Sequence, residues 1–151
     1  MKKLFLLLSL SLFMFSACSS DDDNGKDPIK DKVEASAEMK YEVDNEYVAD
    51  AGAMIFCFQG FSDYVNYSYV GDGKYKHNET GAVVNATEKG IAGNDGVAKI
   101  SVNYGYKSLI VWESKSVKGK YGQNVYEVKK GDPIKISGIY FSETSQPTYP
   151  Y

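Results

Sequence analysis

The stretch "AMIFCF", residues 53–58, says most about the architecture of this chain. Six apolar residues follow one another, two of them aromatic, between the turn-forming stretches "ADAG" (49–52) and "QGFSD" (59–63). An apolar run of this length between turn residues predicts a strand that is buried on both faces. The run "SLIVWE", residues 108–113, has the same dense apolar character and predicts a second interior strand.

Other segments alternate between apolar and polar residues. In "DYVNYSYV" (63–70) the alternation places Val65, Tyr67 and Tyr69 on one face of a strand, with polar residues on the other. This period of two is typical of an antiparallel strand with one face on the core. "VAKISVNY" (97–104) repeats the scheme. Its expected inward residues are Ala98, Ile100, Val102 and Tyr104, and its expected outward residues are Lys99, Ser101 and Asn103.

Turn-forming stretches separate these segments and the later apolar segments "NVYEV" (124–128) and "IKISGIYF" (134–141). They are "GDGK", "GNDG", "NYGYK" and "KKGDP", in which Gly, Asn and Asp tolerate positive φ and Pro fixes its own φ. No segment shows a sustained helical period. The pattern predicts an all-β fold, a single Ig-like antiparallel β-sandwich of about seven strands over residues 41–151.

The order of these turns and strands resembles the carboxypeptidase-regulatory and transthyretin-like group of sandwich domains. The resemblance covers roughly residues 40–140. It is carried by Gly52-Ala53, by Asn94-Asp95-Gly96, by the alternating strand from Val97 to Asn103, and by Gly105-Tyr106. It implies a transthyretin-like sandwich that serves as a non-catalytic accessory, binding or structural module.

The first 17 residues have the build of a secretory signal. Lys2 and Lys3 precede an apolar run over residues 4–15, and a small-residue step, Ser16-Ala17, follows it. This run is shorter than the roughly 20 residues that a membrane-spanning helix needs. Residues 1–17 are therefore predicted to be a signal peptide, and not part of the folded domain.

The residues around Cys18 resemble the processing site of bacterial lipoproteins. "FSAC" (15–18) is similar to a lipobox, which implies cleavage before Cys18 and attachment of lipid to its side chain. Asp21, Asp22 and Asp23 resemble the acidic export signal of Bacteroidetes surface lipoproteins. Together these resemblances imply a lipid anchor in the outer membrane, with the protein exposed at the cell surface. The alternative is that the three aspartates are only part of a solvated tether and carry no export signal.

The segment 18–40 has scarcely a large apolar residue, and it is predicted to be a flexible acidic tether. If Cys18 is acylated, Cys57 is the only remaining cysteine, and its apolar surroundings favour a buried core position over a reactive thiol. Removal of the signal takes away two lysines and leaves 15 basic against 20 acidic residues. A chain this acidic is a poor partner for nucleic acid.

Candidate contact residues come from the tyrosines. The chain has 13 tyrosines and one tryptophan, and tyrosine combines a rigid face with a polar tip that suits recognition surfaces. The expected exposed contacts are Tyr64 and Tyr75, with Tyr106 and Trp112 as neighbours on the other run. Their partner is expected to be a protein surface or a glycan.

Signals for catalysis and for metal binding are weak. His77 is the only histidine, and no serine lies in a Gly-x-Ser-x-Gly turn. Asp72 and Asp95 lie in stretches that suit turns better than calcium, and a Cys/His zinc site lacks its ligands. We therefore expect no cofactor and a non-enzymatic surface lipoprotein that acts as a binding or structural module in an envelope assembly. Two alternatives remain: a glycan-binding lipoprotein that uses its aromatic residues, and a small hydrolase built around His77.

Overall fold

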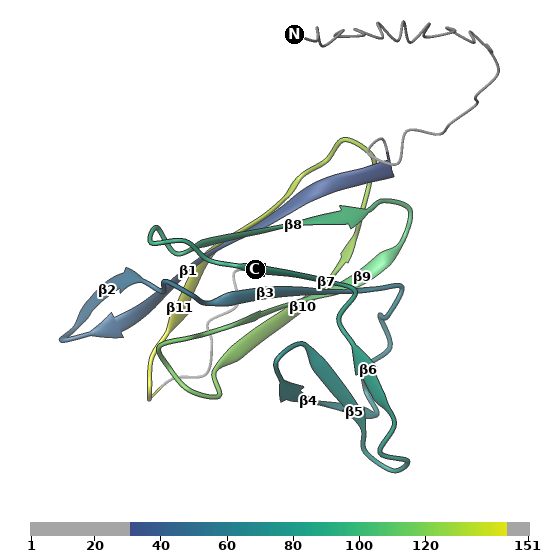
Figure 1. Cartoon of the computed structure of the whole chain (residues 1–151), viewed down its shortest axis with the longest axis horizontal. Helices are drawn as coiled ribbons and strands as arrows, with labels where there is room; N and C mark the ends of the chain where they lie inside the picture. The colour runs from purple at the N-terminus through teal and green to yellow at the C-terminus, as the bar shows by residue number, and fades with distance from the viewer. Residues whose placement is uncertain (1–30, 145–151) are drawn as a thin grey trace, which may run out of the picture.

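The computed structural model describes residues 31–144, which contain eleven strands and no helix (Figure 1). The strands are β1 (Lys32–Val43), β2 (Glu46–Ala49), β3 (Met54–Gln59), β4 (Tyr67–Gly71), β5 (Lys74–His77), β6 (Val83–Asn85), β7 (Glu88–Ile91), β8 (Val97–Asn103), β9 (Lys107–Glu113), β10 (Tyr121–Glu127) and β11 (Ile134–Phe141). The predicted signal peptide, Cys18 and the three aspartates lie outside the described residues.

The strands form three sheets. The front sheet has β1 at its centre, with β11 on one side and both β8 and β2 on the other. The middle sheet has the order β10-β9-β3-β7, and the small sheet has the order β4-β5-β6. In Figure 1 the small sheet lies at the lower right as a separate hairpin-like layer. All pairings are antiparallel except that of β1 with β11, which is parallel.

The front and middle sheets enclose the main core, so the predicted all-β sandwich is confirmed. Ile55 and Cys57 from β3 lie in this core, together with Ile110 and Trp112 from β9. The alternation predicted for β8 is also confirmed, because its Ala98, Ile100 and Val102 are buried while Lys99 and Ser101 are exposed. The two dense apolar runs are thus the central strands of the middle sheet.

The other face of the middle sheet is covered by the small sheet. Phe56 and Phe58 of β3 and Leu109 and Val111 of β9 form a second cluster with Tyr75 of β5. Both faces of β3 and β9 are therefore buried, as the uninterrupted apolar runs predict. The strands β4, β5 and β6 bury this second face. The fold has eleven strands where the sequence pattern predicts about seven, and this extra sheet accounts for part of the difference.

The folded domain begins earlier than predicted. β1 starts at Lys32, so the prediction of a flexible tether that extends to residue 40 is wrong. Ala35, Ala37 and Met39 alternate with polar residues and are completely buried. The small size of Ala35 and Ala37 makes the period of two hard to see, although small side chains are what a central strand needs where two sheets approach closely.

Cys57 and Val65 were both expected to lie inside the fold. Cys57 is buried as predicted, and burial raises the pKa of its thiol. Val65 was expected to point inward but is 83% exposed, because it precedes β4 and takes no part in the strand's alternation. No helix within residues 31–144 has the length and apolar character that a membrane crossing requires.

Candidate binding cleft

A cleft of about 330 Å³ opens where the small sheet meets one end of the middle sheet. One wall is the end of β4, up to Gly71 where the β4–β5 turn begins, and the other is the end of β9, the β9–β10 loop and the start of β10. The side chains that matter for its chemistry are those of Tyr69, Glu113, Lys118 and Tyr121. The cleft therefore combines two aromatic rings, one carboxylate and one ammonium group.

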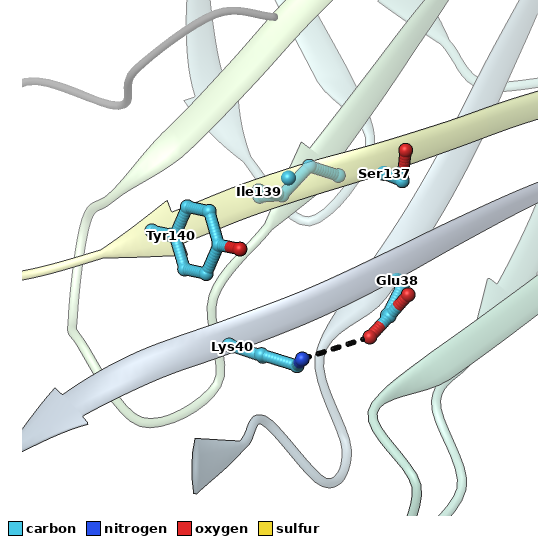
Figure 2. A pocket seen from close by; sticks show the side chains of 6 residues that line it. Glu38, Lys40, Ser137, Ile139 and Tyr140 are labelled. Atoms are coloured by element: carbon cyan, nitrogen blue, oxygen red, sulfur yellow. Dashed lines mark ion pairs between the residues drawn. The ribbon is translucent and has the colours of Figure 1, made fainter. Parts of the chain in front are cut away.

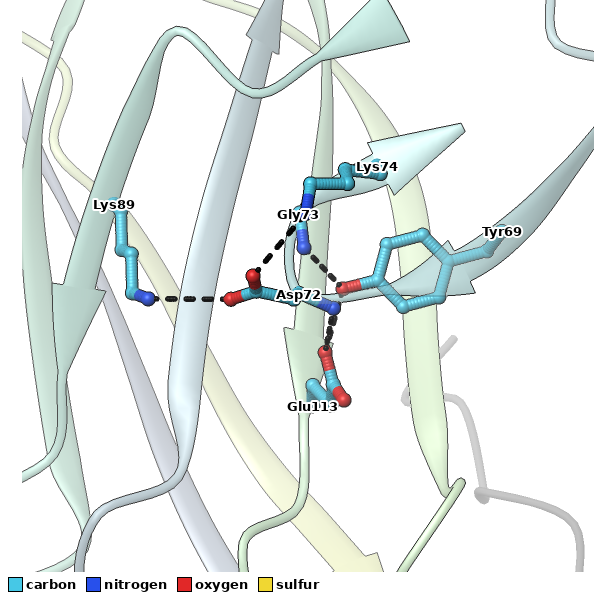
Figure 3. Close-up of polar contacts among 6 residues, drawn as sticks. All are labelled: Tyr69, Asp72, Gly73, Lys74, Lys89 and Glu113. Atoms are coloured by element: carbon cyan, nitrogen blue, oxygen red, sulfur yellow. Dashed lines mark hydrogen bonds and ion pairs between the residues drawn. The ribbon is translucent and has the colours of Figure 1, made fainter. Parts of the chain in front are cut away.

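The carboxylate of Glu113 is fixed by two hydrogen bonds to one of its oxygens. The Tyr69 hydroxyl donates to Glu113 Oε2 at 2.7 Å, and the backbone N–H of Asp72 donates to the same oxygen at 3.1 Å. The Tyr69 hydroxyl in turn accepts from the N–H of Gly73 at 3.0 Å; Figure 3 shows how these groups converge. The other oxygen, Glu113 Oε1, accepts no hydrogen bond from any residue between 31 and 144.

Burial, followed by the hydrogen bond to Glu113, raises the pKa of Tyr69 far above its ordinary value. The phenol therefore stays neutral and keeps donating to Glu113 at any pH at which the protein works. Because the carboxylate is held from one side only, its orientation is set while Oε1 stays available to a ligand on the cleft side.

The β4–β5 turn owes its shape to three residues with positive φ: Gly71 at 88°, Asp72 at 50° and Gly73 at 65°. A Cβ at Gly73 would collide with the ring of Phe56, so glycine lets the turn lie directly on the middle sheet. This close approach brings the N–H of Asp72 within reach of Glu113 and the N–H of Gly73 within reach of the Tyr69 hydroxyl.

The carboxylate of Asp72 is occupied by lysines. It lies 3.4 Å from Lys89 Nζ and 3.5 Å from Lys74 Nζ (Figure 3). The hydrogen bond with Lys89, more than that with Lys74, lowers the pKa of this carboxyl.

The other aspartate considered for calcium, Asp95, caps its own turn, where its side chain accepts from the N–H of Val97 at 3.0 Å. Residues 31–144 contain no cluster of three side chains arranged to hold a metal ion.

The β9–β10 wall of the cleft is anchored by a completely buried carboxylate, that of Asp50. Ser114 Oγ and the N–H of Lys115 donate to its Oδ2 at 2.5 and 3.2 Å. Ser116 donates to Oδ1 with its N–H at 3.1 Å and its hydroxyl at 2.8 Å. These four hydrogen bonds fix the start of the loop, and with it the position from which Lys118 reaches the cleft.

The aromatic wall is a pair of tyrosines. The rings of Tyr69 and Tyr121 lie 4.6 Å apart between centroids and are tilted by 47°. Behind them, Tyr75 packs against Tyr69 at 5.2 Å and donates a hydrogen bond to Gln123. Both rings are half-buried and pack against the second core cluster, which supports the aromatic wall.

The four predicted contact residues lie elsewhere. Trp112 is 2% exposed and Tyr75 is 1% exposed, so their prediction as surface contacts is wrong: both are core residues. Tyr64 is half-buried and packs against Tyr75 at 6.3 Å. Tyr106 is 50% exposed as expected, but it lies in the β8–β9 turn and does not line the cleft. The structure does not bring these four residues together as a surface.

Sequence reasoning missed Glu113, Lys118, Tyr69 and Tyr121 as site residues. Glu113 is the single acid that ends the apolar run 108–113, and an acid at the end of an interior strand is the signal that could have identified it. Tyr69 was correctly predicted to face inward, towards the middle sheet. At this end of the small sheet the inward-facing side chains also line the cleft, so Tyr69 is both a packing residue and a site residue.

His77 has a local structural role. Its Nδ1 accepts hydrogen bonds from the N–H groups of Glu79 and Thr80, both at 3.2 Å. Its ring packs edge-on against Tyr67 at 4.8 Å. In the neutral ring the accepting nitrogen carries no proton, so the proton is on Nε2, and the unprotonated nitrogen is used to close the turn after β5.

A second hollow, of about 280 Å³, lies on the outer face of the front sheet (Figure 2). A bulge creates it, since Ser137 and Gly138 of β11 together face Glu38 of β1. Glu38 pairs with Lys40 at 3.0 Å, and this hydrogen bond raises the pKa of Lys40. The charged groups of this hollow thus satisfy each other, whereas those of the cleft do not.

Comparisons of the chain with family models, curated proteins and solved structures give no match. The chemistry of the site is thus the basis of any functional argument. The cleft offers one acceptor-only oxygen, one donor-only ammonium group and an aromatic surface. Such a set can orient and hold a small polar ligand.

Proposed function

We propose that this protein is a non-enzymatic, lipid-anchored surface protein whose binding site is the cleft between the β4–β5 turn and the β9–β10 loop. The observation that carries this proposal is the arrangement of Glu113. Two donors from the protein hold Oε2, while Oε1 is left for a ligand beside Tyr69 and Tyr121. Holding a recognition group in place before binding lowers the entropic cost of association.

The anchoring half of the proposal rests on the N-terminal sequence. Lys2 and Lys3, the apolar run and Cys18 have the order of a lipoprotein signal, and Asp21 to Asp23 follow as an export address to the outer membrane surface. Cys18 lies 14 residues before Lys32. A segment of this length can span at most about 50 Å, enough to let the domain reach beyond lipid head groups.

The non-enzymatic half is supported by how the reactive groups are used. His77 Nδ1 is occupied by the turn after β5, and the Cys57 thiol is buried with a raised pKa. Glu113 is a single carboxylate, whereas glycoside hydrolysis ordinarily uses two facing acids. These features favour binding over turnover.

The anchor gives the first prediction. In the Cys18→Ala protein, incorporation of a fatty-acid analogue should fall to background, because the acceptor of the acyl chains is gone. Each lost methylene removes about 0.8 kcal/mol of membrane affinity, so the protein should move to the soluble fraction. Metabolic labelling followed by membrane fractionation measures both effects. Equal labelling of parent and variant would contradict lipidation at Cys18.

The cleft gives the second prediction. A photo-crosslinking amino acid in place of Val70 should give an adduct of higher mass in living cells, because Val70 lines the cleft with an exposed side chain that holds no ligand group. The matched control is Val83, an equally exposed valine of β6 that does not line the cleft. We expect adducts at 70 to be at least about five times as abundant as at 83. Equal or absent adducts at both positions would overturn the cleft as the binding site.

A further inference from the structure

We infer that the ligand of the cleft is a saccharide, held as one sugar ring against the tyrosine wall with neighbouring hydroxyls between Glu113 Oε1 and Lys118 Nζ. This inference rests on the proposed function, because it names the ligand class of that same cleft. Three features of the site carry it: its hydrogen-bonding groups, its size and its aromatic wall.

The hydrogen-bonding groups call for a ligand that both donates and accepts. Glu113 Oε1 only accepts, and Lys118 Nζ only donates. Among the described residues, neither group has a partner. An anion would be repelled by Glu113, and a cation would be repelled by Lys118. A neutral ligand with neighbouring hydroxyls satisfies both groups, because each hydroxyl donates one hydrogen bond and accepts others.

The size of the cleft favours a small ligand. Its volume of about 330 Å³ is near the lower end of the range for small-molecule sites, roughly 300 to 1,000 Å³. A sugar unit at the end of a chain fits this space, with the rest of the glycan leaving through the open side. Gly71 and Gly119 at the rim carry no side chains that would obstruct such an exit.

The aromatic wall supplies the remaining contact. A sugar ring has faces made of C–H groups, and a tyrosine ring offers a flat apolar surface of matching size. The rings of Tyr69 and Tyr121 are tilted by 47° to each other, so the wall offers a sugar two differently oriented ring surfaces. Because Tyr69 is tied to Glu113, the apolar wall and the hydroxyl acceptor keep a fixed relation to each other.

The experiment uses the mature acylated protein, purified from membranes in detergent micelles. An array of bacterial and host-type oligosaccharides identifies a probe, and titration calorimetry with that oligosaccharide gives its Kd. We expect at least one saccharide to bind in the micromolar to millimolar range. The free monosaccharide of its terminal unit should compete with it, because one ring fills the cleft.

The sharpest variant is Glu113→Gln, which is close to Glu in shape. The donors Tyr69 O–H and Asp72 N–H require an oxygen, so the amide oxygen must take the place of Oε2. The amide NH₂ then replaces Oε1 in the cleft, and an acceptor becomes a donor. We expect the fold to survive and the affinity to fall by about tenfold or more, as for the loss of a hydrogen bond to a charged group.

Two further variants and one control complete the test. Lys118→Ala should weaken binding by a similar factor, while Lys107→Ala, an exposed lysine at the opposite end of β9 from Glu113 and outside the cleft, should leave the Kd unchanged. Tyr121→Leu keeps apolar volume and removes the ring, and it should weaken binding at least about fivefold. Far-UV circular dichroism confirms that each variant is folded before its Kd is measured.

The outcomes separate this inference from the proposed function. Full affinity in folded Glu113→Gln, or no saccharide binding on the array, overturns the saccharide inference. If a crosslinker at position 70 then still forms adducts and these contain only protein, the binding function stands with a different ligand class. If the crosslinker at 70 also gives no adducts, both the inference and the proposed function fall.

Discussion

Replacement of Trp112 with Ala is expected to lower the free energy of unfolding by about 3 to 5 kcal/mol. The indole is almost fully buried in the main core, where Trp112 pairs across the middle sheet with Ile55 of β3 and with Gly122 of β10. A Cβ at Gly122 would collide with the indole ring, so the two residues fit each other on the core side of β10. Truncation to Ala leaves a cavity that this sheet cannot close.

Urea unfolding followed by far-UV circular dichroism measures the effect, since Trp112 is the only tryptophan and its fluorescence is lost in the variant. Tyr106→Ala is the matched control: this aromatic residue is half exposed, and its loss should change the stability by no more than about 0.5 kcal/mol. If both variants were equally stable, Trp112 would be a surface residue and the sandwich core would be wrongly placed.

The sequence was sufficient to predict the strands that carry the core. The uninterrupted runs at 53–58 and 108–113 indicate burial on both faces, and both are interior strands of the middle sheet. It was not sufficient to predict what covers each face. A buried strand is equally apolar whether a sheet, a helix or a second chain packs on it, so the small sheet could not be inferred from β3 and β9 alone.

The start of the domain was missed for a related reason. In β1 the inward residues 35 and 37 are alanines and the outward residues are mostly charged, so the segment has the composition of a tether. Its pairing with β8 and β11 provides its stability, and such long-range partners leave no mark within the segment itself. Period alone, without regard to side-chain size, would have identified this strand.

The site was harder to predict than the fold. Tyr75 was expected at the surface and Tyr69 inside, yet the two are direct partners in the β4–β5 hairpin and must share a face. The turn at residues 71–73 fixes that pairing and could have corrected the prediction. The meeting of Glu113 with Tyr69, 44 residues apart, depends on how the small sheet folds over the middle one, which no local pattern encodes.

Replacement of Asp50 with Ala is the second change with a large expected effect, a loss of about 3 to 4 kcal/mol in the free energy of unfolding. The side chain accepts four hydrogen bonds from residues 114–116 in a completely buried position. Without the carboxylate these donors lose their acceptor, and a buried unsatisfied donor such as Ser114 Oγ costs about 1 to 3 kcal/mol before relaxation. Opening of the loop to water recovers part of this loss, which limits the net effect.

The opening of the loop should also be visible at the cleft. Lys118 lies two residues after the segment 114–116 that Asp50 holds, so its position in Asp50→Ala becomes variable, the ligand is held less well, and the crosslinking yield at position 70 should fall. Ser116→Ala is the graded control, because it removes one hydroxyl donor and keeps the other three bonds, at a cost of about 0.5 to 1.5 kcal/mol. Hydrogen exchange of residues 114–120 separates the two variants: exchange should be fast in Asp50→Ala and close to the parent's in Ser116→Ala. Slow exchange in a destabilised Asp50→Ala protein would show that the carboxylate supports the core and not the wall of the cleft.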